Sequence, residues 1–108
     1  MPLMRAGPSE QTAVIERTGL ARPWNVVLIN DDDHTYEYVI EMLGTLFGHT
    51  RDRAFLMATE VDRTGRVIVD TTTRERAELK QEQVHAFGPD WRMPSSKGSM
   101  TAEIEPSE

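Results

Sequence analysis

A cluster of polar and acidic side chains follows a short apolar run near the start of the chain. Asn30 is followed directly by Asp31, Asp32 and Asp33, and then by His34. Three adjacent carboxylates repel one another, whereas a turn or a helix cap needs only one or two of them. The cluster therefore raises the question of what positive group, if any, it binds.

Three interpretations of this cluster are open. In the first it is a loop before a helix, in which Asp33 or Thr35 caps the helix and nearby carboxylates favour its N-terminus by ~0.3–1 kcal/mol. In the second it binds a metal, but it lacks the ligand spacing, the Gly and the Glu of an EF-hand loop, and no second Asp/His cluster completes the shell. In the third, a negative corner beside an apolar groove binds a ligand with an ammonium head and an apolar body.

Few other residues could take part in catalysis or metal binding. The three histidines, His34, His49 and His85, are scattered along the chain and predict neither a zinc site nor a catalytic array. No serine lies in a nucleophile elbow, no glycine-rich phosphate loop is present, and the chain has no cysteine. These residues therefore favour no catalytic array, and we expect no metal and no cofactor.

Length and charge restrict the class of protein further. The chain has 108 residues, enough for one domain, and a formal net charge of −6, which argues against nucleic acid and favours a cationic or amine-bearing partner. The longest aliphatic run, residues 26–29, is far too short to span a membrane, and the N-terminus lacks the apolar region of a signal peptide. We expect a cytoplasmic monomer that does not bind membranes.

The elements that position the cluster follow from hydrophobic periodicity and from helix caps. Strands are expected at residues 24–29, 66–69 and 99–104, and helices at 35–47, 51–64 and 73–87. Thr50 should cap the second helix, and Thr72 with Glu75 should form a capping box for the third. The order β-α-α-β-α-β predicts the α+β class, with a small three-stranded antiparallel sheet packed against three helices.

The domain that these elements form is expected to cover residues 23–105. Residues 1–22 are polar, contain Pro and Gly, and show no periodicity, which predicts a flexible N-terminal extension. Residues 106–108 are expected to form a polar tail.

Several segments of the chain resemble one known family. WNVVLINDD at residues 24–32, EYVIEML at 37–43, GRVIV at 65–69 and the late EIEP resemble the ClpS adaptors of the Clp protease. The resemblance covers roughly residues 23–88, and the last strand more weakly. It implies the fold described above and an adaptor that is not an enzyme. Such adaptors capture proteins whose first residue is a bulky hydrophobe, an N-degron, and deliver them to a Clp-type AAA+ unfoldase for degradation.

The resemblance also implies roles for individual residues. The substrate's α-amino group and first peptide unit would be bound by Asn30, Asp31, Asp32, His34 and Asp62. The pocket for the first side chain would be lined by Thr35, Tyr36, Val39, Ala58, Val61 and Met100. The N-terminal domain of the unfoldase would dock on Glu75 and Lys80. The extension at residues 1–22 would take part in transferring the substrate.

Three positions depart from the usual family pattern. Asp62 stands where a histidine commonly contacts the α-amino group, and Ala58 and Tyr36 stand where methionines are usual. The small Ala58 leaves room for branching near the substrate Cα, whereas the stiff ring of Tyr36 narrows the pocket against Trp. The expected partners are therefore proteins with N-terminal Leu, Phe, Tyr or Trp, with Ile and Val as further candidates.

A different class of function fits the same pattern. The C-terminal domain of the ribosomal stalk protein resembles this fold and binds its partners through a helical surface, without recognising an N-terminal residue. In that case the aspartates only cap a helix, and Val39, Ala58 and Val61 are ordinary core. Glu75 would then belong to the capping box and Lys80 to a solvated helix face.

Overall fold

The structure is a computed structural model that describes residues 22–107. Its elements are, in order, β1 (Trp24–Ile29), α2 (Tyr36–Phe47), α3 (Arg51–Thr64), β2 (Arg66–Thr72), α4 (Arg74–His85) and β3 (Thr101–Pro106). This confirms the α+β class and the predicted order of strands and helices. The flexible extension predicted for residues 1–22 lies outside the described residues, except for Arg22, and so does Glu108 at the end of the predicted tail.

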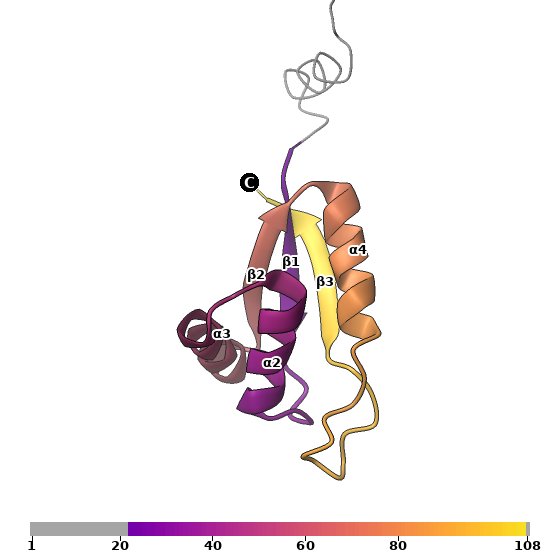
Figure 1. The fold of residues 1–108 in the computed structure, drawn as a ribbon. Coiled ribbons are helices and arrows are strands. Elements are labelled where there is room, and N and C mark those ends of the chain that lie inside the picture. The colour runs from indigo at the N-terminus through magenta and orange to yellow at the C-terminus, as the bar shows by residue number, and fades with distance from the viewer. Residues whose placement is uncertain (1–21, 108) are drawn as a thin grey trace, which may run out of the picture.

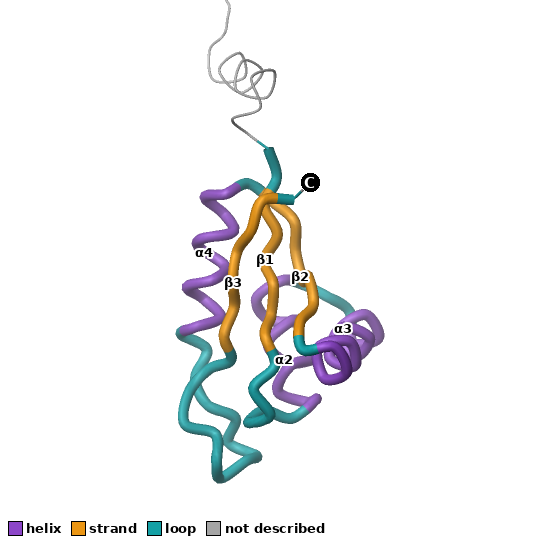
Figure 2. Tube along the Cα trace, turned by 180° about the vertical axis from the view of Figure 1, so that it is seen from behind, coloured by secondary structure: helices purple, strands orange, loops and turns teal. Residues whose placement is uncertain are grey.

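The sheet has three strands in the order β2-β1-β3, and both pairs of neighbours are antiparallel. The central strand, β1, has a neighbour on each side, and residues 25–28 of this strand are all buried. Figure 1 shows α2 in front of the sheet, and Figure 2, which turns the molecule around, shows it behind the strands. The loop after β1 lies at the lower end of the sheet in both views.

The core lies between the sheet and the helices. Val26 and Leu28 of β1 point into it, together with Val67 and Val69 of β2. The apolar residues that α2 buries are Tyr38, Val39, Ile40, Met42 and Leu43. This set covers more than one helix face, because α2 contacts β2, α3 and α4 together.

The helix caps explain where two of the helices begin and end. Thr35 caps α2 by accepting from the Tyr38 amide, and Thr50 caps α3 by accepting from the Arg53 amide. Gly48 and Gly65 end these helices in the left-handed conformation, at φ 75° and 93°. Of the two residues considered as the cap of the first helix, Thr35 is therefore the one that fills that role.

The predicted capping box at the start of the third helix is wrong. Thr72 still pairs with Trp24 in the sheet, so β2 extends beyond the predicted end at Val69. The cap of α4 is Thr73, whose side chain accepts from the Arg76 amide. The prediction failed because consecutive threonines suit both a strand and a cap, and only the pairing with β1 shows where the strand ends.

The last strand lies two residues later than predicted, and α4 ends at His85 instead of residue 87. The strand begins at Thr101, which pairs with Ile29, and ends at Pro106, which pairs with Trp24. Ser99, the predicted first residue, instead accepts a hydrogen bond from the Gly88 amide at 2.6 Å. Its hydroxyl therefore closes the long loop between α4 and β3.

A histidine side chain from outside the sheet bonds the backbone of each outer strand. β2 contains a bulge next to Val69, and the carbonyl of Val69 accepts from His49 Nε2 at 2.7 Å. At the other edge, the Ala102 amide donates to His85 Nε2 at 3.0 Å, and the Ala102 carbonyl accepts from Gln81 at 2.9 Å. Side chains thus bind outward-facing backbone groups of both outer strands.

Candidate functional site

The acidic loop, which we define as residues 30–35, begins at the end of β1. The Asn30 amide donates to the carbonyl of Gly65 at 3.0 Å, which joins this loop to the turn between α3 and β2. The Asn30 side chain accepts from the Asp32 amide at 3.3 Å and donates to the Asp32 carboxylate at 3.1 Å. Asp32 has φ 65°, a left-handed conformation that Asp tolerates better than most residues. Asn30 and Asp32 therefore close a tight turn.

Asp31 pairs with His34 inside this loop. Asp31 Oδ1 accepts from the Asp33 amide at 3.0 Å and lies 2.8 Å from His34 Nδ1. The other ring nitrogen of His34 lies 2.7 Å from the carbonyl oxygen of Gly98, and the histidine side chain is only 3% exposed. Both partners of the ring are acceptor oxygens, so His34 joins Asp31 to the loop before β3.

A residue that the sequence did not single out holds the acidic loop from the other side. Asp90, in the loop between α4 and β3, is buried, and its Oδ2 accepts from the amide and hydroxyl of Thr35 at 2.7 and 2.8 Å. Its Oδ1 accepts from the amide and guanidinium of Arg92 at 3.0 and 3.1 Å. Burial by itself raises the pKa of Asp90, but these hydrogen bonds outweigh it and lower the pKa to about 2.

Four of the residues predicted to line the side-chain pocket lie in the hydrophobic core. Val39 from α2, Ala58 and Val61 from α3, and Met100 before β3 all belong to the same buried cluster. Each of the four is between 1% and 4% exposed. Tyr36 packs against the cluster while remaining partly exposed. These candidate walls therefore share one core and are covered in this structure.

Asp62, on the last turn of α3, is bound by Tyr36. The Tyr36 hydroxyl donates to Asp62 Oδ2 at 2.8 Å, and the Tyr36 ring lies against Phe55 with a centroid distance of 5.8 Å. The hydrogen bond to Asp62 raises the pKa of Tyr36 above its ordinary value of 10.0. This contact joins the first residue of α2 to α3, and periodicity alone could not have indicated it.

The two predicted docking residues on α4 differ in their surroundings. Glu75 is exposed in the first turn, whereas Lys80 is buried. The ammonium of Lys80 donates to the carbonyl of Leu46, near the C-terminus of α2, and lies 5.5 Å from the Phe47 ring centroid. Lys80 therefore binds the end of α2, whereas the solvated helix face was the simpler interpretation of this residue.

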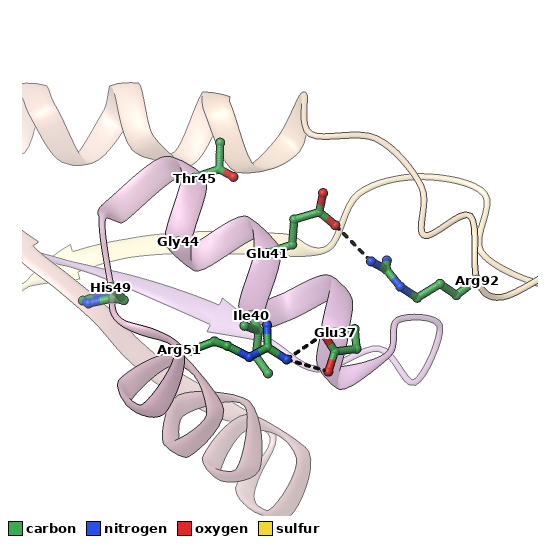
Figure 3. Close-up of a pocket in the computed structure, with 8 residues that line it drawn as sticks. All are labelled: Glu37, Ile40, Glu41, Gly44, Thr45, His49, Arg51 and Arg92. Atoms are coloured by element: carbon green, nitrogen blue, oxygen red, sulfur yellow. Dashed lines mark hydrogen bonds and ion pairs between the residues drawn. The ribbon is translucent and has the colours of Figure 1, made fainter.

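An open depression of about 440 Å³ lies elsewhere, on the outer side of α2 (Figure 3). Two ion pairs cross it, Arg51 with Glu37 at 3.0 Å and Arg92 with Glu41 at 3.1 Å. It is lined by Glu37, Ile40, Glu41, Gly44, Thr45, His49, Arg51 and Arg92. Since none of the predicted binding residues lines it, it is separate from the acidic loop and the pocket walls.

Within residues 22–107, no group of three or more His, Asp or Glu side chains is arranged to hold a metal ion. No helix of the described part of the chain is long and apolar enough to cross a membrane.

Comparison with known proteins gives one family. Residues 20–94 match the model of ClpS, the ATP-dependent Clp protease adaptor protein. The ClpS adapter protein of Deinococcus radiodurans is 35% identical over 82 residues, which cover 74% of this chain and 73% of that protein. A segment of the E3 ubiquitin-protein ligase ubr-1 of Caenorhabditis elegans is 48% identical over 54 residues, half of this chain but 3% of the ligase.

Among solved structures, ClpS2 of Agrobacterium tumefaciens bound to L-phenylalaninamide has the same fold. The two structures superpose with a TM-score of 0.69, covering 81% of this chain and 99% of that one, at 23% sequence identity. The fold that the periodicity predicted is thus found in a solved structure.

Proposed function

This chain belongs to the ClpS family of ATP-dependent Clp protease adaptor proteins, which are not enzymes, and we propose that it captures proteins by a bulky hydrophobic N-terminal residue. It then delivers them to a Clp-type AAA+ unfoldase in the cytoplasm. The observation that supports this proposal is the position of Tyr36, which follows the acidic loop directly, packs against the core that contains Val39, Ala58, Val61 and Met100, and bonds Asp62. A charged group and an apolar group on one ligand can be recognised there together.

The α-ammonium of the substrate binds the acidic loop. Asp31 is exposed, and within residues 22–107 only its Oδ1 atom is engaged, so Oδ2 can accept from the ammonium. Asp62 offers a second carboxylate from α3, and Asn30 can turn its amide from Asp32 to the first peptide unit. His34 contacts Asp31 Oδ1 at 2.8 Å and fixes the orientation of this carboxylate.

The first side chain of the substrate enters between α2 and α3. Val39, Ala58 and Val61 offer apolar walls from the two helices, and Met100 and Thr35 complete the site. The likeness to a structure that contains L-phenylalaninamide supports this placement, because that ligand carries both a free α-amino group and an aromatic side chain. The preferred first residues are Leu, Phe, Tyr and Trp, and the small Ala58 extends the set to Ile and Val.

The expected affinity is close to micromolar. Each hydrogen bond to the charged amine contributes ~1.5–3 kcal/mol, and burial of one large apolar side chain contributes a further ~1.5–3 kcal/mol. After the cost of association, about −8 kcal/mol remains, which corresponds to a Kd of about 1 µM. Such an affinity suits a carrier that must release its substrate.

The experiment is a fluorescence-anisotropy titration of short peptides that differ only in their first residue, each with a free and an acetylated N-terminus. We expect micromolar binding of the free Leu and Phe peptides and a loss of at least tenfold on acetylation, because the charge is removed and bulk is added. Asp31→Asn should weaken binding of the free peptides about tenfold or more. Binding should also weaken above about pH 8, where the α-amino group loses its proton.

The matched control is Asp52→Asn, which removes one negative charge from the exposed first turn of α3. It should leave peptide affinity within about twofold of the parent, since surface charges away from the site are largely screened. If Asp31→Asn binds as tightly as the parent, the acidic loop does not bind the amine. Absence of binding to every free N-terminus would instead favour an interaction domain that binds partners through its helices.

Docking of the unfoldase is proposed for α4. Glu75 is exposed near the N-terminus of this helix and can pair with a cationic group on the unfoldase N-terminal domain. Lys80 contributes by fixing the packing of α4 against α2. The extension at residues 1–22 is proposed to assist the transfer of substrate. We propose that the adaptor works as a monomer.

A further inference from the structure

The proposed pocket is closed in this structure, so a residue must move before a substrate side chain can enter. Val39, Ala58, Val61 and Met100 are each at most 4% exposed. Interiors are close-packed, and a Leu or Phe side chain cannot enter such a cluster without displacing something. The partly exposed residue that packs against these walls is Tyr36. It is therefore the first candidate for the part that moves.

The Tyr36 ring lies along α3 and covers its middle. It contacts the Phe55 ring at one end, and its hydroxyl reaches Asp62 at the other. Phe55 and Asp62 are seven residues apart on the helix, about 10 Å along its axis, and they lie on the same face as Ala58. The ring therefore passes over the turn that contains Ala58, where the small alanine side chain leaves space for it.

Few contacts hold this ring in place. Tyr36 is the first residue of α2, its hydroxyl donates to Asp62 at 2.8 Å with the Thr59 side chain beside it, and Phe55 on the other side of the ring is half exposed. Because Tyr36 keeps its proton well above neutral pH, the hydroxyl acts as the donor to Asp62. Rotation about χ1 that breaks the bond to Asp62 would uncover the walls without unfolding either helix.

Resting on the function proposed above, we infer that Tyr36 is a gate that sets the access of first side chains to the pocket. Its hydrogen bond to Asp62 keeps the gate closed, and the substrate's α-ammonium opens it by taking over the Asp62 carboxylate. The exchange favours the substrate because a cation replaces a neutral hydroxyl as the donor. A ligand without the amine would have to break the bond and leave Asp62 without a donor, so charge recognition and side-chain entry are linked in one residue pair.

The test is Tyr36→Phe, which keeps the ring and removes only the hydroxyl. Free Leu and Phe peptides should bind about threefold to tenfold more tightly to this variant than to the parent, because no hydrogen bond has to be broken. The acetylated peptides should still bind at least tenfold more weakly than the free ones. Thr64→Val is the matched control, since it removes a hydroxyl that bonds Glu60 and Arg66 near the end of α3, away from Tyr36. Its affinity should stay within about twofold of the parent.

A second measurement follows the ring directly. NMR should show contacts between the ring protons of Tyr36 and Phe55 in the ligand-free protein and their loss on saturation with L-phenylalaninamide. If the parent binds the free peptides but Tyr36→Phe binds them equally or less tightly, or if the ring contact persists on saturation, the gate is wrong and the adaptor function stands. If the parent binds no free N-terminus, the proposed function is wrong and the gate with it.

Discussion

At the end of β1, each of the three adjacent aspartates has a different partner. Asp31 contacts the His34 ring, Asp32 accepts from the Asn30 side-chain amide, and Asp33 accepts from the Ser95 hydroxyl. The cluster therefore avoids self-repulsion by giving each carboxylate its own donor. The interpretation as a loop with a helix cap explains Thr35 and part of these contacts, and amine binding remains the proposed role of the rest.

Asp90 gives a prediction for stability against pH. Its folded-state pKa is about 2, below its ordinary value of 3.8, so the unfolded chain takes up the proton first as the pH falls. The stabilisation is fully present above about pH 5 and is lost between about pH 4 and pH 2, amounting to roughly 1–2 kcal/mol after allowance for solvent screening. Asp90→Asn should remove this part of the acid dependence and destabilise the protein at pH 7 by about 2 kcal/mol.

Chemical denaturation followed by circular dichroism, from pH 7 down to pH 2, measures this effect. Asp52→Asn, in the exposed first turn of α3, serves as the comparison and should keep the acid dependence of the parent. An unchanged slope between about pH 4 and pH 2 in Asp90→Asn would contradict the assignment.

Residue roles that depend on local pattern were predictable, and those that depend on distant contacts were not. Residue type and position sufficed to predict the cap Thr50, and they narrowed the cap of α2 to Asp33 or Thr35. The bond between Tyr36 and Asp62 joins residues 26 apart, and Asp90 reaches Thr35 across 55 positions. Their partners become neighbours only when the helices and the long loop are packed.

At the scale of elements, α4 supports α2 through Lys80. Replacing Lys80 with Met keeps the length of the stem but removes the donor to the Leu46 carbonyl and the positive charge near the C-terminus of α2. We expect a loss of about 1–2 kcal/mol in the free energy of unfolding, because a buried carbonyl is left without its partner. Urea denaturation measures this loss.

The chain's other lysine provides the control. Lys97 is exposed, so Lys97→Met should change stability by less than about 0.5 kcal/mol. Glu75→Lys should cost at most about 1 kcal/mol of stability, because it places a cation in the first turn of α4, while weakening binding to the unfoldase N-terminal domain about tenfold. Equal stability of Lys80→Met and the parent would mean that the ammonium does not stabilise the end of α2.

Element types were easier to predict than element ends. Alternating and β-branched residues placed all three strands, but the ends of β2 and β3 follow from the six pairs that each makes with β1. Similarly, α2 buries Tyr38 and Met42 as well as Val39 and Leu43, because three other elements surround this helix. Hydrophobic periodicity predicts one buried face of a helix, but it does not show how many other elements pack against that helix.

Over the whole molecule, the proposed substrate site and the proposed docking site lie at opposite ends of the sheet. The acidic loop follows the last residue of β1. Glu75 instead follows β2, whose last residue, Thr72, pairs with the first residue of β1, Trp24. Figure 1 shows the two ends, with the first turn of α4 at the top and the loop after β1 at the bottom. Six strand residues at ~3.3 Å each separate them by about 20 Å.

This separation predicts that both partners bind at once. The Kd of the unfoldase N-terminal domain should be the same, within about twofold, for the adaptor alone and for the adaptor saturated with a free Leu peptide. Titration calorimetry in the two conditions measures it, with the acetylated peptide as the control ligand. Mutual exclusion of peptide and unfoldase would show that the two sites overlap.

The histidines at the sheet edges have a consequence for the cargo of such an adaptor. An adaptor meets extended chains, and an open strand edge would invite them to join the sheet by backbone pairing. His49 binds the Val69 carbonyl at one edge, and His85 with Gln81 binds Ala102 at the other. An extended segment of a bound protein would first have to displace these side chains before it could pair with the edge of the sheet. The fold therefore resists the strand addition that leads to fibril-like aggregates.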